Sequence, residues 1–161
     1  QLITIDSEDA KDLDDAIDVV RLPNGHFRLG VYIADVSYYV RPGSAIDQEA
    51  YNRGTSVYLV DRVIPMLPTV LSNGICSLNE GVLRLAFSCL MRLDKDGNLT
   101  DYRFVKSVIR SRVKGVYSEI NALLAGSADD ELKGKYHEVL AQLPAMKELY
   151  GHRARLLEEL L

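Results

Sequence analysis

The sequence predicts an α+β fold: a mixed, largely antiparallel sheet with hairpins, flanked by helices and followed by a helical C-terminal part. Two pairs of segments rich in β-branched and aromatic residues, 16–22 with 26–40 and 82–94 with 99–115, each enclose a short turn. This pattern is typical of hairpins. From about residue 129 apolar residues recur at three- and four-residue spacing, which indicates helices. Strands come first and helices later, unlike a regular βαβ series.

The turn of the first hairpin is an Asn-Gly pair at 24–25. Both residue types tolerate a positive φ, which a tight two-residue hairpin turn requires. We therefore expect 16–22 and 26–40 to be paired strands. Asp18 and Asp35 would then lie on neighbouring strands.

Caps and breakers delimit the shorter elements. Ser44, followed three residues later by Asp47, predicts the start of a helix over 45–53. Gly54 is expected to end that helix. Further strands are expected at 2–5 and 56–60, loop with short helical turns at 63–81, and a helix over 119–125 capped by Ser118 and closed by Gly126.

The composition is that of a soluble globular protein, with 47% apolar and 26% charged residues. A net charge of −4 gives no overall argument for nucleic-acid binding, so any such site must be local. Cys76 and Cys89 form neither a CxxC pair nor a dense framework, which favours a reducing, intracellular compartment. No apolar run approaches the roughly 18 residues of a membrane span, so we expect no membrane contact.

Both ends of the sequence interrupt a pattern. The N-terminal QLITIDSED enters an apolar–polar alternation without a methionine, and the C-terminal ARLLEELL carries no helix cap. We therefore expect residues 1–161 to be part of one larger domain, truncated at both ends.

The stretch IDSEDAKDLDDAID, residues 5–18, is half acidic. Its acidic residues are Asp6, Glu8, Asp9, Asp12, Asp14, Asp15 and Asp18. Carboxylates that converge repel one another unless a cation lies among them. Hard oxygen ligands suit Mg²⁺, Mn²⁺ or Ca²⁺, so the stretch is a candidate metal site.

The spacing excludes an EF-hand calcium loop. Counted from Asp12, such a loop needs glycine at its sixth position and glutamate at its twelfth, where this chain has Ile17 and Pro23. Four aspartates in one loop are enough for two Mg²⁺ ions, an arrangement suited to phosphodiester hydrolysis. The alternative is a solvated acidic loop in which Asp12 or Asp15 caps a helix. Since the loop lies between two apolar strands, the residues alone leave both interpretations open.

The sequence resembles the catalytic RNB domain of the ribonuclease II and ribonuclease R family. TIDSEDAKDLDDAI, residues 4–17, is similar to the acidic signature of that family. The similarity continues through 33–68 and 71–89 and, more loosely, through 108–124, so it spans about 120 residues. The DAKDLDDA and DRVIPMLP runs are closer to bacterial ribonuclease R than to ribonuclease II.

The resemblance implies a processive exoribonuclease that degrades single-stranded RNA from 3′ to 5′. It would hydrolyse RNA to nucleoside 5′-monophosphates with Mg²⁺, or with Mn²⁺ as an alternative ion. The implied location is the cytoplasm, with the ribosome or the RNA-degradation machinery as further candidate partners. The rival hypothesis is a non-catalytic RNA-binding relative.

The resemblance also assigns roles to residues. Asp6 and Asp15 would hold the principal Mg²⁺, with Asp12 in support. Asp14 would limit the chemistry, through a second metal ion or the attacking water. Tyr58 would stack on a base near the 3′ end, a contact that tolerates any sequence.

Two parts of the family pattern are missing from this sequence. The Ser-x-Pro-x-Arg-Arg motif, whose arginine is expected to stabilise charge at the scissile phosphate, does not occur. The cold-shock and S1 domains that guide RNA are also absent. We therefore expect the isolated chain to be inactive or very weakly active.

The three basic residues near the end of the predicted strand 99–115, and Asp35, each allow both a functional and a structural interpretation. Arg110, Arg112 and Lys114 alternate along one predicted strand and would share a face, either against RNA phosphates or as a solvated basic surface. Asp35, on a predicted buried strand, could orient a metal ligand or water, or simply serve core hydrogen bonding.

Overall fold

A five-stranded closed barrel forms the centre of the computed structural model, which describes the backbone of residues 1–160 and the side chains of residues 1–151. Its strands, in barrel order, are β1 (Leu2–Asp6), β2 (Asp15–Arg21), β3 (Phe27–Ala34), β6 (Leu83–Leu93) and β7 (Leu99–Val116). Four seams are antiparallel, and β1 closes the barrel by pairing with β7 in parallel. The predicted α+β class with a mixed, largely antiparallel sheet is confirmed; the closure of that sheet was not predicted.

The β2–β3 hairpin forms where the Asn-Gly pair predicts it. Gly25 has φ 82°, and β2 pairs with β3 from Arg21 opposite Phe27 to Asp15 opposite Ile33. The prediction that the second strand runs to residue 40 is wrong. It ends at Ala34, and Asp35 is the N-cap residue of the one-turn helix α1 (Val36–Tyr39). A short polar side chain that bonds locally favours a cap over a strand, and the Asp35 carboxylate accepts a hydrogen bond from Ser37.

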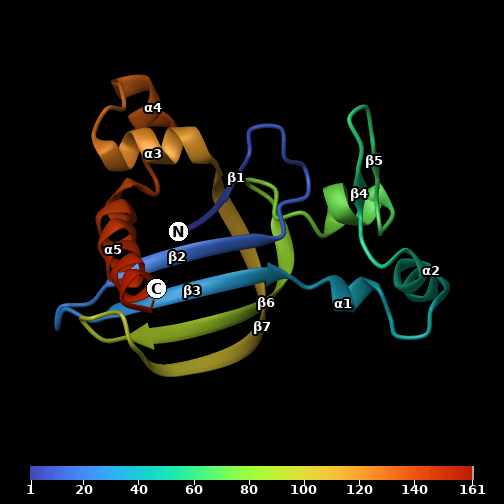
Figure 1. Ribbon diagram of the computed structural model, residues 1–161, viewed down its shortest axis with the longest axis horizontal. Coiled ribbons are helices and arrows are strands. Elements are labelled where there is room, and N and C mark those ends of the chain that lie inside the picture. The colour runs from blue at the N-terminus through green and yellow to red at the C-terminus, as the bar shows by residue number, and fades with distance from the viewer. Residues whose placement is uncertain (161) are drawn as a thin grey trace.

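An arm extends from the barrel after α1, on the right of Figure 1. It contains α2 (Ala45–Arg53), the small hairpin of β4 (Val57–Tyr58) and β5 (Val63–Ile64), and the π-helix η1 (Val70–Ile75). The predicted cap of α2 is confirmed, because Ser44 accepts a hydrogen bond from the Asp47 amide at 3.3 Å. Gly54 ends α2 in the left-handed region, as expected.

Helices cover the opposite side of the barrel. They are α3 (Tyr117–Ala125), α4 (Asp130–Lys135), the 3₁₀ turn η2 (Leu140–Gln142) and α5 (Leu143–Leu160). The helical C-terminal part and the stop at Gly126 are confirmed. Ser118 is not the cap of α3, because β7 continues into the helix without a loop and Val116 takes the cap position. None of the described helices is both long and apolar enough to span a bilayer.

Three clusters of buried side chains join these parts. Leu13, Ala16, Ala34, Cys76, Leu78, Ala86 and Ile109 form the first. Ile3, Val113, Ile120, Tyr136, Val139 and Leu143 connect β1 and β7 to the helices. Val19, Phe27, Leu93, Ala145 and Leu149 connect the far end of β2, β3 and β6 to α5. The first cluster includes Leu13, which immediately precedes Asp14, so the acidic stretch is anchored in the barrel core.

A buried polar group also lies among the barrel strands. The Asp18 side chain accepts hydrogen bonds from the Tyr32 hydroxyl at 2.9 Å and from the Arg28 guanidinium at 3.2 Å. Burial, followed by the charge of Asp18, raises the pKa of Tyr32 to about 12. Gly30 lies against this pair, where a side chain would collide with Asp18 and Tyr32. Asp18 is therefore a structural residue of the barrel.

Candidate active site

The acidic stretch forms a loop, residues 7–14, at the end of the barrel that faces the arm (Figure 1). Asp6 is the last residue of β1, and Asp15 is the first residue of β2. Asp12 and Asp14 lie in the loop between them, with both side chains exposed. All four aspartates singled out from the sequence therefore belong to one loop and its two flanking strand ends. We refer to residues 7–14 as the acidic loop.

A buried serine fixes the middle of the acidic loop. Ser77 is fully buried, and its hydroxyl accepts a hydrogen bond from the Leu13 amide at 3.0 Å. The same hydroxyl donates to the Lys11 carbonyl at 2.8 Å. The Leu78 amide donates to the Leu13 carbonyl at 2.9 Å, and the Leu13 side chain is 1% exposed. Asp12 and Asp14 therefore project from a backbone that is held on both sides of Leu13.

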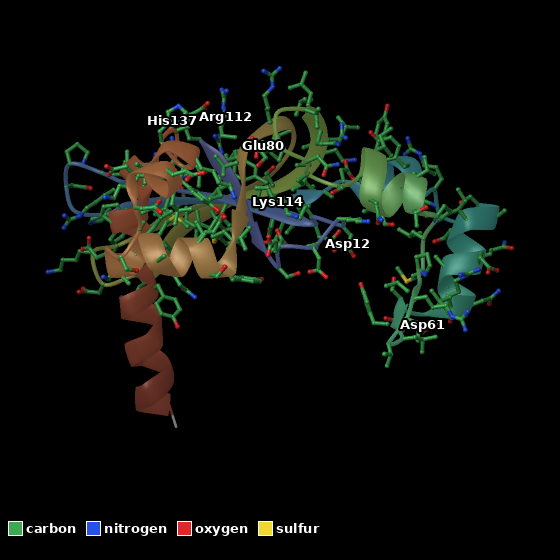
Figure 2. The ribbon with its side chains drawn as sticks, turned by 90° about the horizontal axis from the view of Figure 1, so that it is seen from above. Asp12, Asp61, Glu80, Arg112, Lys114 and His137 are labelled. Atoms are coloured by element: carbon green, nitrogen blue, oxygen red, sulfur yellow. The ribbon has the colours of Figure 1, made fainter. Side chains whose placement is uncertain are left out.

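A lysine fixes the first part of the same loop. The Lys114 ammonium on β7 donates to the backbone carbonyls of Glu8 and Ala10, each at 2.8 Å. The Lys114 amide is bonded to the Glu80 carboxylate at 2.9 Å. Figure 2 shows Lys114 between Glu80 and the side of the acidic loop that carries Asp12. The sequence did not predict that Ser77 and Lys114 hold the acidic loop. The two residues lie about 65 and 105 positions away from the loop residues that they contact.

Electrostatics at the loop disfavour the charged state of two carboxyl groups. Burial raises the pKa of Asp6 above its usual value, the charge of Asp15 raises it further, and Lys114 opposes the rise. Partial desolvation of its carboxyl group also raises the pKa of Asp14, although the side chain is exposed on the surface, and repulsion from Asp12 and Asp15 adds to the rise. Mutual repulsion among these groups is what a bound cation would relieve.

The chemistry of these groups fits a hard divalent cation. The Asp6 Oδ2 atom is buried and has no hydrogen-bond partner, although a buried carboxylate oxygen normally has one. The neighbouring side chains of Asp12, Asp14 and Asp15 offer carboxylate oxygens as metal ligands, which suit Mg²⁺ or Mn²⁺. Within residues 1–151, however, no three His, Cys, Asp or Glu side chains lie close enough together to hold a metal as they stand. Mg²⁺ needs only one or two carboxylates when water and a substrate phosphate complete its shell.

Tyr58 lies beside the acidic loop although it belongs to the arm. Its side chain is 68% exposed, and its hydroxyl donates to Asp12 Oδ2 at 3.4 Å. The charge of Asp12 raises the pKa of Tyr58. Asp12 and Tyr58 line a shallow groove together with Ser56, Val63, Pro65, Thr69, Ser72 and Asn73. An exposed ring next to a carboxylate cluster can stack on a base while the adjacent phosphate meets the carboxylates.

Asp35 has other partners. Its side chain is 5% exposed, accepts from the Ser37 hydroxyl at 2.6 Å and pairs with the Lys106 ammonium at 3.3 Å. The Ser37 hydrogen bond is the main cause that lowers the pKa of Asp35. These contacts are a local hydrogen bond to the first turn of α1 and an ion pair with β7. A role toward a metal ligand stays a prediction.

The three basic residues alternate along β7 with buried neighbours, so they do share one strand face. Arg112 lies 3.6 Å from the Glu138 carboxylate, and Lys114 is bonded to the acidic loop. Both therefore have protein partners. Arg110 is exposed, and an RNA contact for it stays a prediction.

The RNB domain family model matches residues 1–158. Ribonuclease R of Thermotoga maritima is 59% identical to this chain over 123 residues, which are 76% of the chain and 17% of that protein. The solved structure "Mycoplasma genitalium RNase R in complex with ribose methylated single-stranded RNA" superposes with a TM-score of 0.85 at 35% identity. That superposition covers 96% of this chain and 24% of the Mycoplasma chain.

A more distant likeness concerns the fold alone. Yeast Ssd1, whose structure is described as that of a pseudonuclease, superposes over 86% of this chain and 17% of its own, with a TM-score of 0.70 at 19% identity. The chain spans less than a fifth of the Thermotoga protein and about a quarter of the Mycoplasma chain. Since the RNB model matches nearly all of its residues, the chain belongs to the RNB domain family.

Proposed function

We propose that this chain is part of the catalytic domain of a processive exoribonuclease, which hydrolyses single-stranded RNA from 3′ to 5′ and releases nucleoside 5′-monophosphates with Mg²⁺. The observation that carries the proposal is the acidic loop. It and its flanking strand ends bring four aspartates to one end of the barrel, and one of the four, Asp6, has a buried oxygen without a hydrogen-bond partner. Ribonuclease R relatives and the family match support the same reaction class.

Each aspartate has a proposed role. Asp6 and Asp15, at the facing ends of β1 and β2, would hold Mg²⁺, with Asp12 in support. Bound there, Mg²⁺ would lower the pKa of water and neutralise charge on the scissile phosphate. Asp14 is exposed at the end of the anchored loop and would orient the attacking water, directly or through a second ion. Mn²⁺ has the same ligand preference and is expected to substitute.

Single-stranded RNA is the proposed substrate. The exposed Tyr58 ring, whose hydroxyl reaches Asp12, supplies a stacking surface beside the carboxylates. Stacking is sequence-tolerant, which a general RNA degrader requires. The Mycoplasma relative was solved with single-stranded RNA, which supports this substrate class.

A cytoplasmic location is part of the proposal. Cys76 and Cys89 are both free, which fits a reducing compartment. Association with the ribosome or with the RNA-degradation machinery stays a prediction.

The test is degradation of a single-stranded RNA by the full-length protein that contains this chain. We expect nucleoside 5′-monophosphates to be released from the 3′ end only when Mg²⁺ or Mn²⁺ is present. The same RNA with a blocked 3′ end is the control and is expected to stay intact. Internal cleavage of the blocked RNA, or equal release in EDTA, would contradict the proposal.

A second candidate function is non-catalytic RNA binding. It is favoured by the absence of three convergent ligands within residues 1–151 and by a shared fold with a pseudonuclease. The two candidates differ in one outcome of the same experiment. A binding protein would retain the RNA in a complex and release no nucleotides at any Mg²⁺ concentration.

A further inference from the structure

The Lys114 side chain contacts the acidic loop at two separate points. Its ammonium donates to the Glu8 carbonyl and to the Ala10 carbonyl, both at 2.8 Å. An ammonium has three donors, so these contacts use two of them within the protein.

The position of Lys114 on the barrel makes this contact rigid. Residue 114 lies opposite Thr4 on the parallel β1–β7 seam, two residues before Asp6. Its backbone amide is bonded to Glu80, which pairs with Ser111 through an isolated bridge. The ammonium is therefore carried by a strand that is fixed on both sides, and it reaches over the end of β1 to the loop.

The rest of the loop is held independently. Ser77 bonds the Lys11 carbonyl and the Leu13 amide, which follow the two carbonyls bound by Lys114. Together the two residues restrain four positions of the loop between Asp6 and Asp14. Without Lys114, residues 8–10 would lose their two hydrogen bonds to the barrel, and the segment that connects Asp6 to Asp12 would no longer be fixed at its start.

We propose that Lys114 is a positioning residue, which holds the acidic loop in the conformation that binds a divalent cation. The inference rests on the proposed function, because it concerns the same carboxylates. It is an alternative to the two interpretations of Lys114 considered from the sequence, a contact with RNA phosphates and a solvated basic surface. Lys114 would act through the loop backbone and would not touch the ion.

The change in cation affinity when Lys114 is removed distinguishes a positioning role from a purely electrostatic one, because the two roles predict changes in opposite directions. Lys114 carries a positive charge close to Asp6. If that charge were all that mattered, its removal would tighten the binding of a cation. If the hydrogen bonds to the loop matter more, its removal weakens binding, because partners that orient metal ligands are worth about 10- to 100-fold in affinity.

The experiment compares Mn²⁺ binding by the wild-type chain, Lys114→Met and Lys114→Arg, measured by electron paramagnetic resonance without RNA. We expect about tenfold or weaker binding for Lys114→Met and partial rescue by Lys114→Arg, which keeps the charge and can donate to carbonyls. Lys147→Met is the matched control, because Lys147 donates to the Leu124 carbonyl at 2.9 Å on the helical side of the molecule. It should bind Mn²⁺ as the wild type does.

Amide hydrogen exchange supplies a readout that needs no metal. We expect faster exchange within residues 7–14 in Lys114→Met, with unchanged protection in β2 and β3. Equal or tighter Mn²⁺ binding by Lys114→Met, or unchanged exchange in the loop, would overturn the inference and leave the proposed function intact. Loss of Mn²⁺ binding by Asp15→Asn, which removes a carboxylate proposed to hold the ion, is the internal reference. A wild-type chain that bound no Mn²⁺ even with a nucleoside 5′-monophosphate present to complete the shell of the ion would overturn the proposed metal-dependent function, and this inference with it.

Discussion

Asp6 and Asp14 are placed where their own charge is disfavoured. Burial is the first cause for both, and neighbouring carboxylates add to it. A group whose pKa is raised in the folded state binds protons more readily there than in the unfolded chain. Its contribution to stability is therefore present at low pH and is lost as pH rises through the folded-state value. At neutral pH without a cation, the two groups weaken the fold.

Asp14→Asn is thus expected to raise the melting temperature at pH 7 in EDTA. The charge that opposes folding is removed, while the exposed side chain has space for an amide. The gain should shrink as pH is lowered toward the ordinary carboxyl value of 3.8. Thermal unfolding at a series of pH values measures it. A lower melting temperature for Asp14→Asn at pH 7 would show that this carboxylate stabilises the chain.

Tyr58→Ala is expected to weaken single-stranded RNA binding by the full-length protein by about tenfold, because base stacking on an aromatic is worth about 1–3 kcal/mol. Tyr58→Phe keeps the ring and loses the bond to Asp12, so it should bind nearly as well as the wild type. Fluorescence anisotropy with a labelled oligonucleotide measures both.

Tyr51→Ala is the control for that experiment. Tyr51 is 86% exposed on α2 and does not line the groove beside the acidic loop. If Tyr51→Ala and Tyr58→Ala reduced the affinity for RNA equally, the loss of any exposed aromatic ring would explain the result. The proposed base stacking on Tyr58 would then be contradicted.

At the scale of elements, the parallel β1–β7 seam decides where Asp6 lies. Asp6 is opposite Val116, and Lys114 is opposite Thr4. The seam is tight at Gly115, where an added Cβ would collide with the Thr4 carbonyl oxygen and press on Ile3. Backbone contact at this position leaves no room for a side chain, so the glycine is required by space and not by a special φ.

Gly115→Ala is expected to destabilise the fold by about 1–3 kcal/mol, the usual cost of overpacking a well-packed site. Gly134→Ala in α4 is the control with the opposite sign. A Cβ at Gly134 meets nothing within 4 Å, and alanine is favoured over glycine in a helix by up to about 1 kcal/mol. Urea unfolding of both variants measures the difference. Equal stability of Gly115→Ala and wild type would mean that the seam can open without cost.

Local elements could be predicted from the sequence because their signals are local. The Asn-Gly turn, the Ser44 cap and the spacing of the four aspartates each lie within a few residues. The parallel seam could not be predicted, because it joins residues about 110 positions apart. A similar separation in sequence is why the contacts of Lys114 with the Glu8 and Ala10 carbonyls could not be predicted. Asp35 misled the strand prediction because the local hydrogen bond between its side chain and Ser37 competes with the apolar pattern around it.

At the scale of the whole molecule, the acidic loop lies between two bodies. The barrel with its helices is on one side, and the arm that carries Tyr58 is on the other (Figure 1). Asp61, at the turn between β4 and β5, lies far from the barrel in Figure 2, while the Tyr58 hydroxyl reaches Asp12. The carboxylates and the stacking surface come from different parts of the chain and meet at this junction.

The chain of residues 1–161 is expected to release nucleoside monophosphates at least about 100-fold more slowly than the full-length protein. The arginine motif that would stabilise charge at the phosphate does not occur in this sequence, and such a donor is worth about 10²–10³ in rate. Single-turnover assays of both proteins at equal concentration measure the ratio. Comparable rates, abolished by Asp14→Asn, would mean that the four aspartates suffice.

The most direct test of the proposed catalytic role of Asp14 measures RNA turnover and RNA affinity separately in the full-length protein. Asp14→Asn is compared with Asp9→Asn, which removes the same charge from an exposed position of the same loop. We predict that Asp14→Asn loses about 100-fold or more in turnover while its affinity for single-stranded RNA stays within about threefold, and that Asp9→Asn changes neither. Loss of binding and turnover together in Asp14→Asn, or equal losses of turnover in both variants, would contradict the claim that Asp14 acts in the chemistry.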